Sequence, residues 1–122
     1  LFRSLNTTVY SNTAKQNFLG VSPLTLATHG AVSQAVACEM AEGAAKKANS
    51  SIGLSITGIA GPTGGTPQKP VGLAYVGLYS GKEAATTHCV VVNSHLQRPQ
   101  IKRRFTQFAL YVLWQFLHQG KL

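Results

Sequence analysis

The chain has 122 residues, of which 44% are hydrophobic, 8% aromatic and 11% charged, a composition typical of one compact domain and not of a disordered tail, a coiled coil or a collagen repeat. Eleven Lys and Arg against three Glu and no Asp give a formal charge of +8, which favours anionic partners and excludes chemistry that needs Asp. No apolar run approaches the roughly 18 to 20 residues of a membrane span, and the start lacks the order of a signal peptide, so we expect a soluble protein that is not secreted.

The first part of the chain predicts a strand that leads into a short helix. Residues 7–10 are β-branched or aromatic and therefore favour a strand. Asn12 is a suitable N-cap for a helix over residues 14–19, which we expect to end at Gly20.

Two further helices are expected in the next thirty or so residues. Ser22 and Pro23 form an N-cap and a first-turn proline, and Gly30 closes the short helix that they begin. Ser33 is a cap for a longer amphipathic helix, which should end near Asn49.

Three strands should follow. Apolar residues alternate with small or polar ones over residues 52–57, which is the period of a strand. Residues 72–79 and 84–92 predict two more strands, and the short connection 80–82 between them predicts a hairpin with antiparallel pairing.

The last element is expected to be a helix that ends at Gly120. Its apolar residues recur at helical spacing: Ile101, Phe105, Phe108, Val112 and Phe116. The order strand, helices, three strands and helix predicts an α/β domain with a mixed sheet, without an internal repeat or a linker between domains.

The segment 57–72 directly follows a predicted strand and holds five glycines and three prolines. Glycines let backbone N–H groups approach an anion or an amide, and prolines stiffen the loop. The segment matches neither the Walker pattern nor Gly-x-Gly-x-x-Gly, so the residues alone leave open whether it borders a site or is a plain surface connection.

Three side chains outside this segment are candidates, each with a structural alternative. Lys15 could act as a base if burial lowered its pKa, but it could also be an ordinary solvated lysine. Tyr10, five residues earlier, could equally serve packing. Arg98 stands at the start of the last helix, where it could grip a phosphate or carboxylate or belong to a solvated basic face with Lys102, Arg103 and Arg104.

The remaining residue types indicate what the protein does not use. The cations are scattered and not interleaved with aromatic residues, so we do not expect a nucleic-acid partner. Cys38 and Cys89 are too few for a disulfide scaffold and lack zinc spacing, which predicts buried, reduced thiols in a cytoplasmic protein. The four histidines have no mutual metal-ligand spacing, so we expect no metal site.

Several phrases, taken together and in order, resemble one family. They are Tyr10-Ser11-Asn12-Thr13-Ala14-Lys15, Leu19-Gly20-Val21, His29-Gly30-Ala31-Val32-Ser33, Met40-Ala41-Glu42-Gly43, Thr57-Gly58-Ile59-Ala60-Gly61-Pro62, Gly64-Gly65-Thr66-Pro67 and Lys69-Pro70-Val71-Gly72. The chain is similar through them to the C-terminal domain of the competence and damage-inducible protein CinA, whose standalone form is called PncC.

The resemblance implies an amidohydrolase that converts nicotinamide mononucleotide to nicotinic acid mononucleotide and ammonia, without a metal or other cofactor. It also implies a three-layer α/β/α fold and homodimers. In this family a serine attacks the carboxamide and a lysine is its base. By position in the motifs, the catalytic residues would be Lys15, Tyr10 and Thr57, with Thr57 and nearby backbone N–H groups stabilising the oxyanion. The substrate-binding residues would be Gly58, Gly61, Gly64, Gly65 and Arg98.

One part of the family pattern has no counterpart in this chain. The nucleophile belongs to a Thr-Ala-Glu-Ser-Cys-Thr-Gly-Gly phrase upstream of the tyrosine and lysine, and residues 1–9 do not resemble it. We therefore expect residues 1–122 to form a single CinA-like domain that is incomplete at its N-terminus. Two alternatives to the enzyme stay open: a catalytically inactive module that binds a ligand or a partner, and a basic protein associated with nucleic acid.

Overall fold

A computed structural model describes residues 4–119, and its centre is a three-stranded antiparallel sheet. The strands are β1 (Gly53–Gly58), β2 (Leu73–Tyr79) and β3 (Thr86–Val91), in the order β1-β2-β3. Thr57 lies opposite Tyr75, and Tyr75 lies opposite Cys89. The antiparallel hairpin predicted for β2 and β3 is therefore confirmed.

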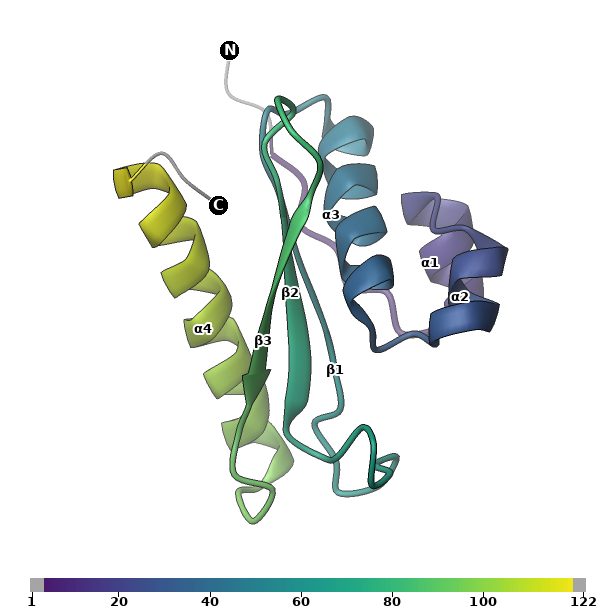
Figure 1. Cartoon of the computed structure of the whole chain (residues 1–122), viewed down its shortest axis with the longest axis vertical. Helices are drawn as coiled ribbons and strands as arrows, with labels where there is room; N and C mark the ends of the chain where they lie inside the picture. The colour runs from purple at the N-terminus through teal and green to yellow at the C-terminus, as the bar shows by residue number, and fades with distance from the viewer. Residues whose placement is uncertain (1–3, 120–122) are drawn as a thin grey trace.

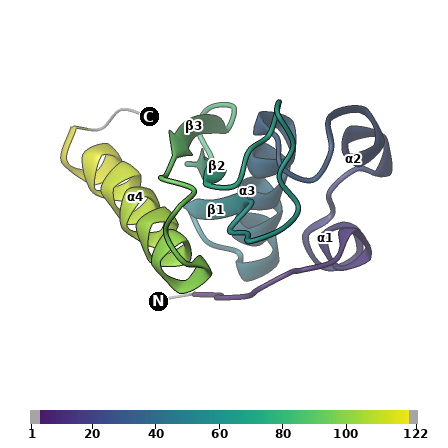
Figure 2. The ribbon, with the colours of Figure 1, turned by 90° about the horizontal axis from the view of Figure 1, so that it is seen from below.

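Four helices cover the two faces of this sheet. They are α1 (Asn12–Leu19), α2 (Pro23–His29), α3 (Gln34–Ala48) and α4 (Arg98–Gln119). Helix α4 covers one face and α3 the other, while α1 and α2 lie outside α3 (Figures 1 and 2). The α/β class and the three-layer arrangement are as expected.

Local sequence signals explain where the first three helices begin and end. Ser33 accepts a hydrogen bond from the N–H of Val36 at 3.2 Å, and Asn49 ends α3 in the left-handed conformation, as the caps predicted. Gly20 ends α1 in the same conformation. The N-cap of α1 is Ser11 and not Asn12, because the hydroxyl of Ser11 accepts from the N–H of Ala14 at 3.0 Å.

Helix α3 lies against the sheet with almost no side chain between the two backbones. A Cβ atom at Gly77, in the middle of β2, would collide with the carbonyl of Ala37 on α3. On the neighbouring strand the hydroxyl of Ser55 donates to the same carbonyl at 2.6 Å. Helix α1 approaches α3 just as closely, since a Cβ at Gly43 would collide with the carbonyl of Leu19. These contacts fix α1, α3 and β1 relative to one another.

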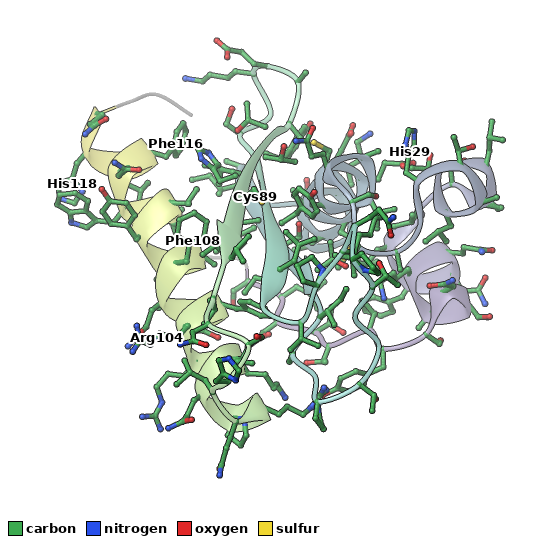
Figure 3. All side chains as sticks on the ribbon, turned by 60° about the horizontal axis from the view of Figure 1, so that its bottom comes forward. His29, Cys89, Arg104, Phe108, Phe116 and His118 are labelled. Atoms are coloured by element: carbon green, nitrogen blue, oxygen red, sulfur yellow. The ribbon has the colours of Figure 1, made fainter. Side chains whose placement is uncertain are left out.

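The other face of the sheet is covered by one side of α4. Its buried residues are Ile101, Phe105, Ala109 and Val112, at spacings of three and four. Phe108 and Phe116 pack against the same core and lie on the sheet side of the helix in Figure 3, whereas His118 points away. The helix continues to Gln119, and the expected stop at Gly120 lies outside the described residues.

The structure corrects the expected first strand. Residues 7–10 are not part of the sheet, although Figure 2 shows the segment before α1 running past the sheet on the β1 side. A cavity separates this segment from β1, and the carbonyl of Val9 accepts a hydrogen bond from Lys15 instead of pairing with a strand. As a result, the strands within residues 4–119 pair only antiparallel, and the parallel part of the expected mixed sheet is not present there.

The prediction of two buried thiols is half wrong. Cys38 on α3 is partly buried, but Cys89 on β3 is exposed, since β3 is an edge strand in which half-buried and exposed side chains alternate from His88 to Val91 (Figure 3). A separate finding is that none of the helices within residues 4–119 is both long and apolar enough to cross a membrane.

We predict that Gly77→Ala destabilises the domain by about 1–3 kcal/mol, because the new methyl group must push α3 away from β2. Urea unfolding followed by circular dichroism measures this change. The control is Thr87→Ala, which removes atoms from the residue paired with Gly77 on the other neighbouring strand and creates no collision. Equal stability of Gly77→Ala and the wild type would contradict the close approach of α3.

Candidate active site

A cavity of about 610 Å³ lies along the open edge of β1. Its lining comes from α1 and α3 on one side of the sheet, from the first turns of α4 on the other, and from residues 5–10 of the segment before α1. Five of the residues expected at the site line this cavity: Tyr10, Lys15, Thr57, Gly58 and Arg98. The fold thus brings together residues that are up to 88 positions apart, from Tyr10 to Arg98.

Lys15 is held inside the cavity by the start of α1. Its side chain is only 7% exposed, and its Nζ donates to the carbonyl of Val9 at 3.2 Å. Burial lowers the pKa of Lys15 from its ordinary value of 10.5. In the described part of the chain the ion pairs do not include Lys15, so no carboxylate opposes this shift. The alternative of a solvated lysine is therefore wrong, and burial favours the neutral amine that a base needs.

Thr57 is at the end of β1, 6% exposed, and its hydroxyl is already engaged. Its Oγ1 donates to the carbonyl of Ala31 at 2.7 Å. A hydroxyl has one proton, so in this arrangement Thr57 offers the cavity lone pairs only.

A backbone donor stands beside this hydroxyl. The N–H of Ile59 donates to Leu73 of β2 at 2.9 Å, and successive N–H groups of a strand point to opposite sides. The N–H of Gly58 therefore points away from β2, toward the open edge where the cavity lies. The N–H of Gly58 is therefore better placed than the hydroxyl of Thr57 to stabilise an oxyanion.

Arg98 and Tyr10 lie at the rim. Arg98 is the first residue of α4, and its guanidinium donates to the carbonyl of Gly61 at 2.8 Å, which leaves other N–H groups for a ligand. Tyr10 is 76% exposed. Lys102, one turn after Arg98, also lines the cavity. We did not expect Lys102 at the site, although its spacing of four from Arg98 is the signal that places both on one face of α4.

The glycine-rich loop joins β1 to β2 and borders a second, more open hollow of about 910 Å³. Gly64 and Gly65 line this hollow together with residues 94–98, so they are not in the cavity that holds Lys15. Gly61 lines neither space but is buried and anchors Arg98 through its carbonyl. Arg98 borders both spaces, so it lies between the expected residues of the cavity, such as Lys15, and those of the hollow, Gly64 and Gly65.

Within residues 4–119, His, Cys, Asp and Glu side chains form no group of three or more that could hold a metal ion. The cavity that holds Lys15 is lined by three cationic side chains, Lys15, Arg98 and Lys102, and by no acidic one among the described residues. The cavity is therefore suited to bind an anionic molecule, and a neutral amine at Lys15 could accept a proton during a reaction of that molecule.

Comparisons with known proteins agree with this fold and these motifs. The model of the CinA C-terminal domain family matches residues 4–117. A CinA-like protein from Kosmotoga olearia is 54% identical over 101 residues, which is 83% of this chain and 24% of that protein. A putative competence-damage inducible protein from Thermoanaerobacter sp. strain X514 is 46% identical over 114 residues, 93% of this chain and 27% of that protein.

Solved structures give the same answer. The competence/damage inducible protein CihA from Agrobacterium tumefaciens has a TM-score of 0.81 at 36% identity, covering 86% of this chain and 63% of its own. The competence damage-inducible protein A from Klebsiella pneumoniae MGH 78578 has a TM-score of 0.82 at 29% identity, covering 92% and 68%.

The chain belongs to the CinA C-terminal domain family. It spans about a quarter of the length of the curated relatives that it matches.

We predict that Lys15→Met makes the domain more stable near neutral pH, because folding of the wild type there must either bury an ammonium group or remove its proton. The pKa of Lys15 is lowered in the folded state, so between that lowered value and 10.5 the unfolded chain binds more protons and wild-type stability rises with pH. The advantage of Lys15→Met should shrink over this window. Thermal melts of both proteins from pH 7 to pH 10 measure it, and a difference that does not change with pH would contradict the lowered pKa.

Proposed function

We propose that this domain hydrolyses the carboxamide of nicotinamide mononucleotide to give nicotinic acid mononucleotide and ammonia. The observation that carries the proposal is the buried Lys15, which has no carboxylate partner in the described chain and shares one cavity with Thr57 and Arg98. Family membership supports it, because the resemblance to CinA-type amidohydrolases assigns catalytic roles to Lys15 and to Thr57.

In the proposed reaction, a serine oxygen attacks the carboxamide carbon while the neutral amine of Lys15 takes the serine proton. The carbonyl oxygen gains the negative charge, and the backbone N–H of Gly58 beside Thr57 stabilises it. The ammonium of Lys15 then gives its proton to the leaving nitrogen, which departs as ammonia and leaves an ester. Water, deprotonated by Lys15, hydrolyses the ester and restores the serine.

The phosphate of the nucleotide would bind at the α4 end of the cavity. Arg98 and Lys102 supply positive charge there, and the positive N-terminal end of the α4 dipole adds to it. Arg98 keeps its bond to Gly61, so phosphate binding also involves the glycine-rich loop. The net charge of +8 favours the approach of such an anion.

The serine is the one group of this mechanism that residues 1–122 do not supply in a recognisable motif. We propose that a Thr-Ala-Glu-Ser-Cys-Thr-Gly-Gly segment upstream of the chain provides it. The second candidate, a catalytically inactive module that binds the nucleotide, is favoured by the same observation if no such segment exists. Homodimerisation and a cytoplasmic location stay predictions.

Ammonia release from nicotinamide mononucleotide separates these two candidates. The assay uses the protein encoded by the whole gene, and the sequence upstream of Leu1 is read first. We expect the serine phrase to be present and ammonia to be released in a time-dependent way. Binding of the nucleotide without ammonia release would instead establish the inactive module.

In the active protein, Lys15→Ala should lower kcat by about 10²–10⁴-fold, because general-base catalysis contributes on that order. KM should change much less, since the amine acts mainly in the transition state. Steady-state ammonia release measures both constants. Lys82→Ala, an exposed lysine in the turn between β2 and β3, is the control and should behave as the wild type. A normal kcat for Lys15→Ala would remove Lys15 from the mechanism.

Arg98→Ala should raise KM about tenfold or more and lower kcat less, because it removes a charged hydrogen-bond donor from the substrate phosphate. The same assay measures it, and nicotinamide riboside, which lacks the phosphate, should show a far smaller effect. Arg104→Ala is the matched control, since Arg104 is an exposed residue of the same helix outside the cavity. An unchanged KM would contradict the role of Arg98.

A further inference from the structure

The connection between α2 and α3 receives side-chain hydrogen bonds on three successive carbonyls. The carbonyl of His29 accepts from Nζ of Lys69 at 2.6 Å, that of Gly30 from the hydroxyl of Ser33 at 2.9 Å, and that of Ala31 from Thr57 at 2.7 Å. The donors come from the glycine-rich loop, the cap of α3 and the end of β1. One short segment therefore ties together three parts of the structure that surround the site.

Lys69 is the only one of these donors that comes from the glycine-rich loop. It closes a small turn in which the N–H of Thr66 donates to the carbonyl of Lys69 at 2.8 Å and the N–H of Lys69 donates to the hydroxyl of Thr66 at 3.0 Å. Because of these two bonds, residues 66–69 move as a unit. The side chain of Lys69 thus holds this whole turn against the end of α2.

The chemistry of the bond indicates that it is directed and not incidental. His29 is the last residue of α2, where the helix leaves carbonyls without intrahelical donors, and an ammonium group is the favoured partner for them. The N···O distance is short, 2.6 Å, and the positive charge of the donor strengthens the bond. Ion pairs within residues 4–119 do not include Lys69, so no carboxylate competes for its ammonium. Figure 3 labels His29 at the end of α2 that lies toward α3.

Lys69 itself is not part of the candidate site. It lines neither the cavity with Lys15 nor the hollow with Gly64, whereas Thr66, to which it is bonded, does line the hollow. At the other side of the loop, Gly61 offers its carbonyl to Arg98. Side-chain hydrogen bonds therefore join the loop to α2, through Lys69, and to α4, through the carbonyl of Gly61.

We propose that Lys69 is a positioning residue that fixes the glycine-rich loop to the α2–α3 connection. Through that connection it sets the place of the loop relative to Thr57, which is bonded to the same segment, and relative to Arg98. The part that concerns substrate rests on the proposed function: with the loop fixed, Arg98, which is bonded to the carbonyl of Gly61, presents a preformed site to the phosphate. Loss of the bond should weaken binding of the nucleotide and leave the chemical step nearly intact.

Three variants test this proposal. Lys69→Met removes the donor and keeps the length of the side chain, Lys69→Arg keeps a charged donor, and Lys82→Met removes a lysine that is exposed in another turn and serves as the control. The first measurement is hydrogen exchange of the amides of residues 62–72, which needs no activity. We expect exchange about tenfold faster in Lys69→Met, near wild type in Lys69→Arg and unchanged in Lys82→Met. Equal exchange in Lys69→Met and the wild type would overturn the proposal.

The second measurement is ammonia release from nicotinamide mononucleotide, with the dissociation constant of the nucleotide measured beside it. For Lys69→Met we expect KM to rise about three- to tenfold with kcat within about twofold of the wild type, a change that Lys69→Arg largely reverses. A looser loop with an unchanged KM and dissociation constant would overturn the substrate part. If the wild type neither binds nor hydrolyses the nucleotide, the proposed function fails, and the exchange data alone still decide whether Lys69 holds the loop.

Discussion

The close approach of α3 to the sheet is the constraint on which the rest of this structure depends. Gly77 allows the backbone of α3 to lie directly on β2, and Gly43 allows α1 to lie directly on α3. Hydroxyl groups of β1 then reach carbonyls that only such a distance makes accessible, from Ser55 to Ala37 and from Thr57 to Ala31. Lys15 on α1 and Thr57 on β1 come to line the same cavity because α1 packs on α3 at Gly43 and β1 is bonded to α3 through Ser55.

This arrangement also explains the electrostatics of the site. Lys15 enters the cavity from a helix that cannot move away, so its amine is removed from water and only one carbonyl compensates it. The three cations along the cavity come from two elements on opposite sides of the sheet. Burial lowers the pKa of Lys15, so its ammonium loses a proton more readily. Arg98 and Lys102, at the outer end of the cavity, remain available to bind an anion. One cavity thereby combines a base with an anion site.

Much of the fold follows from local signals in the sequence. Caps such as Ser33 and stops such as Gly20 act within one helical turn. The period of two in β1 correctly predicts a strand, but its buried residues are the small and polar ones, while Leu54 and Ile56 are half-buried. Residues 7–10 show the limit of such signals. Their strand propensity is real, but a strand also needs a partner, and the cavity beside β1 keeps that partner out of reach.

The candidate site was predictable to the extent that its residues sit in recognisable motifs, as Lys15 and Thr57 do. Contacts between distant residues were not. The bond from Arg98 to Gly61 spans 37 positions, and the bond from Lys69 to His29 spans 40, and neither leaves a local pattern. The hydrogen bond from the Thr57 hydroxyl to the carbonyl of Ala31 could not be predicted for the same reason. Because this bond uses the hydroxyl proton, the N–H of Gly58 is the group left to donate to an oxyanion.

A crystal structure of this chain with nicotinamide mononucleotide bound is the most direct test of the site. We predict that the carboxamide lies within hydrogen-bonding distance of Nζ of Lys15 and of the N–H of Gly58, with the phosphate on the guanidinium of Arg98. A nucleotide bound elsewhere on the domain, or one bound with its phosphate beside Lys15 and its carboxamide in solvent, would contradict it.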